Sequence, residues 1–473
     1  MRVEAPLAQQ GFIEDDARVA STIGLAPEFV NEMNNTWHDE LGTIAVDGGP
    51  EGTADRFHVG PDDLTGGGGM KIKYYPTRKE ALSDGYAHAK GMRDKAGALG
   101  HTEYAGRKSI INLDPTLLTP AQLREVMRAK ARLMHAAGHT NPRVDKPAAD
   151  EATGPYIDDY VKALEDIGVP AAYASVTCKS DMTARGPATG RMAAAVHRVF
   201  MESEERGIER TAVQGAGFAG LYYAAEAVQP RYASEYQIPL AAIGDLDNER
   251  QPFTLMTADP HGLAIDPDWA DSLLLHPEAD PDLQHEKVKG NRLLALARKL
   301  ERAGVPFAAR TQNVLTISPE YADCLTPAAT SRVVTAGLIG QIGVTRWTVI
   351  ANHVVDDGVP PEALDAYAIR PSELVSAGGL AMSFEERDRD VERMGAEACG
   401  EAFTPQPDAV YEQRVHGVMT RTARQIIAMG NRFNFSPTEA TVAVSLGNYA
   451  IARGARIDDG VRELLGGRVP VAA

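Results

Sequence analysis

The chain of 473 residues contains only three cysteines, Cys178, Cys324 and Cys399, and they lie far apart. An odd number of isolated cysteines provides neither a disulfide framework nor paired zinc ligands, and it favours a reducing compartment such as the cytoplasm. The chain also lacks an apolar run of about 18 residues, the length that would cross a membrane. Its first residues lack the apolar core of a secretory signal.

Positive charge is also scarce, because 48 lysines and arginines stand against 65 acidic residues, giving a net charge of −17. Phosphate backbones and anionic lipid surfaces repel such a chain, so we expect neither nucleic acid nor membrane as a partner. The 12 histidines include no H-E-x-x-H spacing, and we expect no metal site. The apolar content of 44% is ordinary for a globular protein, and the length suggests two or three domains.

One segment combines an apolar strand with a glycine-rich turn. Arg210–Gln214 is predicted to be a short buried strand, and Gly215, Gly217 and Gly220 follow it in the pattern G-x-G-x-x-G. In a dinucleotide site these glycines allow a tight turn, close approach of a pyrophosphate and close helix packing. The N-terminus of the following helix offers N–H groups to the phosphates. Because 44 glycines also produce this pattern by chance, its meaning depends on the surrounding chain.

Short apolar strands alternate with helices after this turn. The expected strands are Leu240–Gly244, Val314–Ile317, Thr348–Ala351 and Ala366–Ile369, with a helix near Pro327–Leu338 and a surface excursion over residues 250–290. This alternation indicates a doubly wound parallel sheet, whose ligands lie beyond the carboxyl ends of the strands. Asp245 directly follows the first of these strands and is expected to accept a hydrogen bond from a ribose 2′-hydroxyl. It therefore favours NAD over NADP, although Arg250 is close in sequence.

The patterns in the first part of the chain allow more than one interpretation. Glycines 66–69 run into a strand and suit either a linker or close approach of a ligand. A helix is expected over Thr77–Ala96, and Lys108 precedes an expected strand, Ser109–Leu113. A lone lysine is usually a solvated surface residue, so neither Lys95 nor Lys108 stands out alone. Asp150 by itself is typical of a helix cap.

Several motifs nevertheless follow one another in a specific order. They are a glycine strand, G-M-x-x-K, G-x-K-x-x-I-x-x-D-P, D-x-x-T-G, A-T-G, V-Q-G-x-G, an aspartate at a strand end, an A-N turn and an A-G-G segment. This order resembles the amino-acid dehydrogenases that include glutamate, leucine, phenylalanine and valine dehydrogenases, over roughly residues 54–455. The shared order is more specific than any single motif.

The resemblance implies a role for each matching residue. Lys95 would pair with the substrate α-carboxylate, Lys108 would be the catalytic lysine, and Asp150 would move protons beside it. The implied nucleotide-binding residues are Thr189, Gly215, Ala216, Gly217, Phe218, Ala219, Gly220, Asp245 and Asn352. These roles suit the chemistry, because a lysine acts as a base only when burial or neighbouring cations lower its pKa. The implied cofactor is NAD, and the implied partners are an amino acid or 2-oxo acid with ammonia.

The substrate pocket departs from the family pattern. If Gly68 and Gly69 match the family's paired glycines, Gly67 takes the place of a lysine in glutamate enzymes and of an apolar residue in leucine enzymes. Lys71 then matches a structural basic residue, whereas Ser383 matches a serine of the glutamate enzymes. A pocket that is roomy at Gly67 and polar at Ser383 suggests a nonstandard substrate.

The expected architecture is α/β in two domains. Residues 1–183 form the substrate-binding and oligomerisation domain, residues 184–385 the Rossmann-type NAD-binding domain, and residues 386–473 C-terminal helices that return to the first domain. The resemblance implies a homo-oligomer. Two alternatives stay open: a noncatalytic NAD-binding relative, which the altered motifs at Ser109 and Ser376 suggest, and reduction of a specialised imine or keto acid on the same site.

Overall fold

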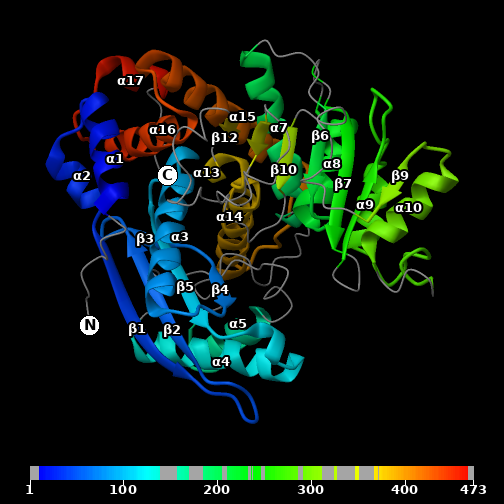
Figure 1. The fold of residues 1–473 in the computed structure, drawn as a ribbon. Coiled ribbons are helices and arrows are strands. Elements are labelled where there is room, and N and C mark those ends of the chain that lie inside the picture. The colour runs from blue at the N-terminus through cyan, green and yellow to red at the C-terminus, as the bar shows by residue number, and fades with distance from the viewer. Residues whose placement is uncertain are drawn as a thin grey trace. The chain divides into compact units, whose positions relative to one another are not determined.

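Two compact units make up the chain in the computed structural model (Figure 1). The structure describes residues 10–138, 157–169, 185–204, 210–232, 236, 238–246, 251–285, 291–311, 324–327, 347–350, 367–370 and 372–466. The first unit comprises Met1–Met182, Ser383–Gln406 and Ala428–Ala473, and the second comprises Thr183–Met382 and Pro407–Ile427. Residues 407–427, which we expected to return to the first domain, thus group with the second unit. Among the described residues no helix is long and apolar enough to cross a membrane.

The first unit is built around a five-stranded sheet. Its strands run in the order β1 (Thr36–Ile44), β2 (Gly52–Val59), β5 (Tyr104–Asn112) and β3 (Thr65–Gly67), and β4 (Met70–Lys73) also pairs with β5. β2 is antiparallel to both β1 and β5, whereas β3 and β4 are parallel to β5. The central strand β5 therefore contacts both the hairpin and the glycine segment.

Helices cover both faces of this sheet. α3 (Arg78–Ala98) packs on one face, where Phe57, Tyr86 and Ile110 are buried. α4 (Pro120–Ala136) and α5 (Ile157–Glu165) contribute to the hydrophobic core on the other face. A capping box of Thr119 and Gln122 fixes the start of α4.

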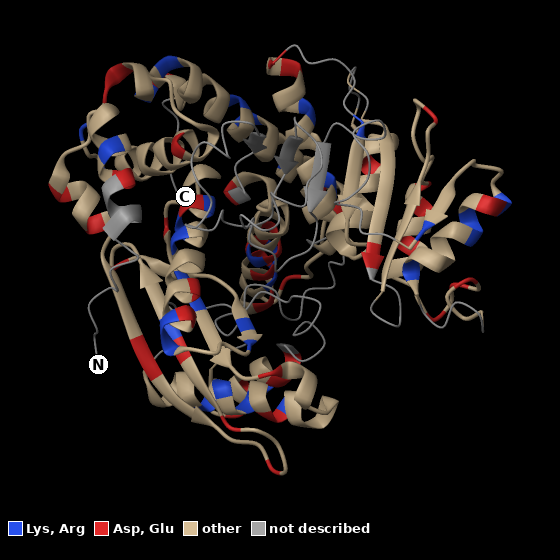
Figure 2. Cartoon of the chain, viewed as in Figure 1, with Lys and Arg blue, Asp and Glu red and all other residues tan. Residues whose placement is uncertain are grey.

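A buried ion network attaches the N-terminal helix to α3. α1 (Gln10–Thr22) supplies Asp16, and α3 supplies Lys90, Arg93 and Asp94. Arg93 Nη2 lies 2.7 Å from Asp16 Oδ2 and 2.6 Å from Asp94 Oδ1, and Lys90 Nζ lies 3.0 Å from Asp16 Oδ1 and 2.8 Å from Asp94 Oδ2. Two cations and two anions thus balance, and Figure 2 shows both signs of charge following each other along α3.

The other described helices of the first unit are α2 (Pro27–Met33), α16 (Pro437–Ala452), α17 (Asp459–Leu464), most of α14 (Gly378–Ala398) and the last residues of α15 (Asp408–Phe433). α16 packs on α3 and begins with a capping box of Ser436 and Glu439. Its Tyr449 is fully buried against the backbone of α3 and β5. α3 is therefore held on several sides.

The second unit contains a seven-stranded sheet. Its order is β12 (Tyr367–Arg370), β11 (Trp347–Ile350), β10 (Cys324–Pro327), β6 (Thr211–Gln214), β7 (Leu240–Leu246), β8 (Pro252–Met256) and β9 (Ala308–Arg310). The strands from β12 to β7 are parallel, whereas β8 and β9 are antiparallel additions. Strand order reverses between β6 and β10, and this reversal is where doubly wound sheets bind ligands.

Some expected elements differ from those observed. Pro327 ends strand β10, and residues 328–338 of the expected helix lie outside the described residues. The expected surface excursion over residues 250–290 contains β8 and α9 (Pro267–Leu274). Val314–Ile317 lies outside the described residues. The fold class itself, α/β in two domains with a doubly wound sheet, is confirmed.

Helix packing in the second unit explains why residues 407–427 belong to it. α7 (Arg185–Ser203) packs on α8 (Phe218–Val228), and α15 (Asp408–Phe433) supplies the buried Glu412. Glu412 Oε1 accepts from Arg191 at 2.5 Å and Oε2 accepts from Arg231 at 2.8 Å. These charge-assisted bonds attach the first part of α15 to this unit. α10 (Arg292–Arg302) and α13 (Ser372–Val375) complete it.

Candidate functional site

Lys108 lies within strand β5, and the expectation that it precedes the strand is wrong. It stands opposite Phe57 of β2, and directly opposed residues of neighbouring strands project from the same face of a sheet. Phe57 packs on α3, since a Cβ at Gly85 would lie 2.3 Å from its ring. Lys108 therefore projects toward α3 and is half-buried there.

The glycine segment lies directly beside Lys108 and is not a linker. Gly67 pairs with Gly106, and Gly69 O accepts from Ser109 N at 3.1 Å. A Cβ at Gly68 would lie 1.3 Å from Arg107 O, so only glycine fits there. The run of glycines thus lets the backbone of residues 66–69 approach the strand that carries the candidate catalytic lysine.

A cluster of ionisable side chains lies on the same face of the sheet. Lys71 Nζ lies 2.8 Å from Asp84 Oδ2, and the Tyr75 hydroxyl donates to the same carboxylate oxygen. Burial opposes the ionisation of Asp84, but nearby His88 and Lys71 outweigh it and hold the pKa of Asp84 far below its ordinary value. His88 Nδ1 lies 2.8 Å from Asp84 O. The ion pair with Asp84 means that Lys71 has a carboxylate partner within the chain itself.

The other expected substrate residues lie on two helices. Lys95 is on α3, half-buried, seven residues after His88 and hence on the same side of the helix. Ser383 is buried on α14, and the next residue, Phe384, packs on Tyr104 with ring centroids 4.8 Å apart. A Cβ at Gly67 would lie 3.2 Å from Tyr104, so this aromatic ring connects Gly67 with the start of α14.

The expected nucleotide turn has the geometry that its glycines predict. Gly215 has φ +103°, a conformation that favours glycine, and Gly217 is the N-cap of α8. Phe218, Ala219 and Gly220 form the first turn of this helix. Asp245 Oδ2 accepts from Ala216 N at 2.7 Å, and Asp245 is exposed. A dinucleotide fits this arrangement, because a helix N-terminus and an exposed carboxylate adjoin one turn.

The position of Asp245 differs slightly from expectation. β7 does not end before it but continues to Leu246, because β8 pairs with its last residues and places Phe253 opposite Asp245. Thr189 lies half-buried in α7, one residue before Gly190, where a Cβ would lie 2.3 Å from Ala219 O. Gly190 thus permits α7 to pack closely on the helix that follows the glycine turn. Asp150 and Asn352 lie outside the described residues.

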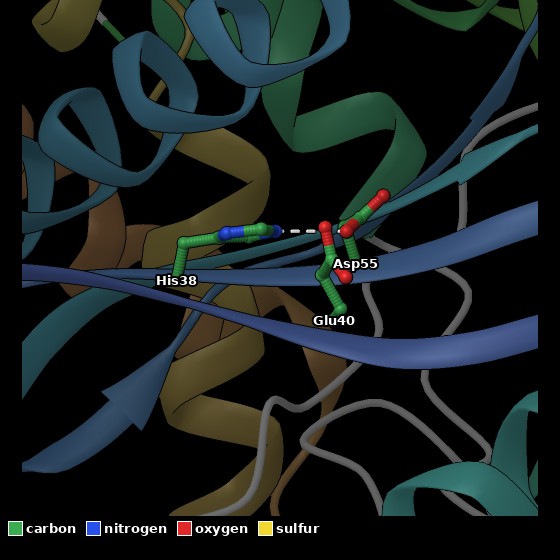
Figure 3. A group of neighbouring side chains, drawn as sticks. All are labelled: His38, Glu40 and Asp55. Carbon is green, nitrogen blue, oxygen red and sulfur yellow. Dashed lines mark hydrogen bonds and ion pairs between the residues drawn. The ribbon is translucent and has the colours of Figure 1, made fainter. Parts of the chain in front are cut away.

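One group of side chains has the composition of a metal site. His38 and Glu40 of β1 and Asp55 of β2 point toward one another (Figure 3), and their ligand atoms lie within 4.8 Å of one another. The guanidinium of Arg78 already contacts this group, since Nη2 donates to Glu40 Oε1 at 2.6 Å and to Asp55 Oδ1 at 2.8 Å. Burial disfavours the ionised form of Asp55, but hydrogen bonds from His38 and Arg78 outweigh it and lower its pKa. An internal cation thus takes the place that a metal ion would fill.

We therefore expect removal of metal ions to leave the thermal midpoint unchanged. Arg78 neutralises the carboxylates, and a bound divalent cation would have to displace it. The measurement is differential scanning calorimetry before and after dialysis against a chelator, with Arg78→Met as the matched variant that removes the internal cation. A lower midpoint of the unaltered chain after dialysis would contradict this expectation.

Sequence reasoning missed Asp84 and His88. Their spacing of four residues, followed by seven residues to Lys95, places all three on one side of α3. This periodicity was visible in the sequence. Their proximity to Lys71 and Lys108 depends on strand register and could not be read from it.

Comparisons with known proteins identify the fold. No family model matches the chain, and no curated protein matches its sequence. A glutamate dehydrogenase from Peptoniphilus asaccharolyticus has a similar structure, with a TM-score of 0.60 and 18% identity over 98% of this chain and all of that chain. The leucine-bound hetero-hexameric glutamate dehydrogenase from Thermus thermophilus gives a TM-score of 0.65 and 16% identity, over 94% of this chain and 96% of that one. Glutamate dehydrogenase 2 from Plasmodium falciparum gives a TM-score of 0.63 and 15% identity, over 94% of this chain and 93% of that one.

Proposed function

We propose that the chain is an NAD-dependent dehydrogenase that oxidatively deaminates an L-amino acid, or aminates the corresponding 2-oxo acid. One observation carries the proposal above the others. The ordered motifs that resemble amino-acid dehydrogenases occur in a chain whose fold is similar to glutamate dehydrogenases over more than nine-tenths of its length. Low identity and the glycine at position 67 support a substrate other than glutamate.

In this function Lys108 acts as the base that activates water against the oxidised substrate carbon. Half-burial and the neighbouring cation Lys71 both favour the neutral amine that a base requires. Lys95 binds the substrate α-carboxylate, and Asp150 exchanges protons with Lys108. Gly67, Gly68, Gly69 and Ser383 border the substrate.

The turn of residues 215–220 would hold the pyrophosphate, Asp245 the adenosine ribose, and Thr189 and Asn352 the nicotinamide. When bound, NAD supplies the hydride acceptor, and the protein supplies orientation and charge. Asp245 is well placed for ribose because its bond to Ala216 N fixes the carboxylate beside the turn.

The decisive experiment measures NADH formation at 340 nm with a panel of L-amino acids, and NADH consumption with 2-oxo acids in the presence and absence of ammonia. We expect turnover with a larger or polar amino acid, whereas oxidation of glutamate at ordinary enzyme rates would contradict the argument from Gly67. Ammonia-independent oxidation of NADH would indicate reduction of an imine or keto acid instead. Binding of NAD without turnover on any substrate would support a noncatalytic relative.

Asp245 is expected to set the preference for NAD. Asp245→Ala removes an acceptor for the ribose hydroxyl and should lower kcat/KM for NAD about ten- to a hundredfold, as loss of a hydrogen bond to a charged group does. It should also weaken discrimination against NADP, because the carboxylate repels a 2′-phosphate. Asp245→Asn is the matched control, since its amide oxygen can still accept from Ala216 N while the charge is lost. Unchanged cofactor ratios in both variants would exclude this role.

We further propose that the chain forms a homo-oligomer. The Thermus protein of similar fold is a hetero-hexamer, and that similarity supports assembly here. Light scattering coupled to size-exclusion chromatography measures the mass directly. A mass of 50.7 kDa, that of one chain, would contradict this proposal.

A further inference from the structure

His88 lies in α3 between Asp84 and Lys95 and projects from the same side of the helix as both. The sheet opposite presents two lysines. Lys71 stands opposite Ile110 in the β4–β5 pair, which makes it the diagonal neighbour of Lys108 on the same face. Lys108, Lys71 and His88 therefore share the space between β4, β5 and α3.

The hydrogen bond from His88 fixes which ring nitrogen carries the proton. Nδ1 lies 2.8 Å from the Asp84 carbonyl oxygen, which can only accept. In the neutral ring Nδ1 therefore carries the hydrogen and Nε2 carries the lone pair. Nδ1 also lies 3.3 Å from Asp84 Oδ1, whereas Oδ2 of the same carboxylate accepts from Lys71 and from the Tyr75 hydroxyl.

The charge state of His88 follows from its surroundings. Burial, followed by the positive charge of Lys108, lowers the pKa of His88 to about 3 against the opposing influence of Asp84. The imidazole is thus neutral at pH 7 and lies within electrostatic range of Lys108. The charged groups that act on His88 are Lys108, Asp84 and Lys71, and the Tyr75 hydroxyl donates to the same Asp84 carboxylate.

We propose that His88 is a positioning residue for Lys108, whose Nζ it orients by presenting Nε2 as a hydrogen-bond acceptor. The inference rests on the proposed function in that it takes Lys108 as the reactive amine. A neutral acceptor suits this task. It fixes the direction of the amine and stabilises the ammonium after Lys108 has taken up a proton, whereas a carboxylate would keep Lys108 permanently protonated.

Three substitutions of His88 distinguish the contribution of Nε2 from that of Nδ1. His88→Gln keeps an acceptor near the place of Nε2, His88→Asn keeps only a donor near the place of Nδ1, and His88→Leu keeps neither. His135→Leu, on the exposed end of α4, is the matched control for loss of an imidazole. Melting curves of all four variants establish that they are folded.

The pKa of Lys108 can be measured without any substrate. Trace acetylation over a range of pH, followed by mass spectrometry of the Lys108 peptide, gives the titration of this amine. We expect His88→Leu and His88→Asn to lower the pKa of Lys108 by about one unit, because the ammonium loses an acceptor. His88→Gln should restore it. Equal Lys108 titration in all variants, or failure of His88→Gln to restore it, would overturn the proposal.

A second measurement uses unaltered His88. In ¹⁵N-histidine-labelled protein, Lys108→Met should shift the His88 Nε2 resonance and leave that of His135 unchanged, and no shift would also overturn the proposal. Neither measurement depends on turnover. If the Lys108 titration behaves as expected but no substrate is turned over, only the proposed function is contradicted. If a substrate is turned over but the Lys108 titration is the same in all variants, only the role of His88 is contradicted.

Discussion

Replacing Lys108 by alanine is expected to lower kcat about 10²- to 10⁴-fold, the usual contribution of a positioned acid–base group. Lys108 lies on β5 of the first unit and the glycine turn lies in the second, so binding of NAD should be unchanged. The measurements are NADH formation with the best substrate of the panel and a fluorescence titration with NADH. Together they separate loss of chemistry from loss of cofactor.

Two further variants test whether Lys108 acts as a base. Lys108→Arg keeps the positive charge but cannot release its proton at neutral pH, so it should be as inactive as the alanine variant. Lys79→Ala removes an exposed lysine from α3 and should retain full activity. If Lys108→Arg kept most of the activity, Lys108 would contribute charge and not proton transfer.

Replacing Arg93 by methionine is expected to destabilise the protein by about 3–5 kcal/mol, since it removes one of the two cations that balance the buried carboxylates of Asp16 and Asp94. The Arg93 side chain is fully buried and also donates to Asn34 Oδ1 at 2.6 Å and to Met33 O at 2.9 Å. Denaturant unfolding followed by circular dichroism measures the loss. Arg128→Met is the control, because Arg128 pairs with Asp159 while 45% of its side chain is exposed, and it should cost less than about 1 kcal/mol.

The same network predicts how stability depends on pH. Burial alone would raise the pKa of Asp94, but Arg93 and Lys90 outweigh it and lower the pKa in the folded state. A carboxyl whose folded pKa is depressed stabilises the protein above its unfolded pKa of about 3.9 and loses that contribution as the pH falls further. Unfolding should therefore become easier below about pH 4, and less steeply so in Asp94→Asn. A pH dependence identical in the two proteins would show that other carboxylates govern acid unfolding.

Local signals in the sequence identified much of the fold. Thr77, the capping box at Thr119 and the positive-φ glycine at Gly215 each act through neighbours within a few residues. Their positions could therefore be predicted from the chain alone. The helix that begins after Thr77 and the turn at Gly215 both occur where the sequence predicts them.

Long-range pairing explains what could not be predicted. β10 consists of four residues and is stabilised by β6 and β11, which are remote in sequence. The extension of β7 through Asp245 depends on β8, whose strand tendency is hidden in an acidic, proline-containing segment. The sequence predicts that the strand begins after Lys108, because Gly106 weakens the strand pattern. In the structure Gly106 lies within the strand, and a Cβ there would lie 1.9 Å from Ala89 O of α3. The proximity of α3, which carries His88, to Lys108 on β5 is tertiary in the same sense.

The strand at one edge of the seven-stranded sheet has a consequence for solubility. β9 is only three residues long, Ala309 and Arg310 are exposed, and no other described strand pairs with its outer side. Edge strands that are long, flat and apolar recruit strands from other molecules, whereas short edges that carry charge do not. This edge therefore protects a sheet with a largely apolar interior from aggregation in a crowded solution.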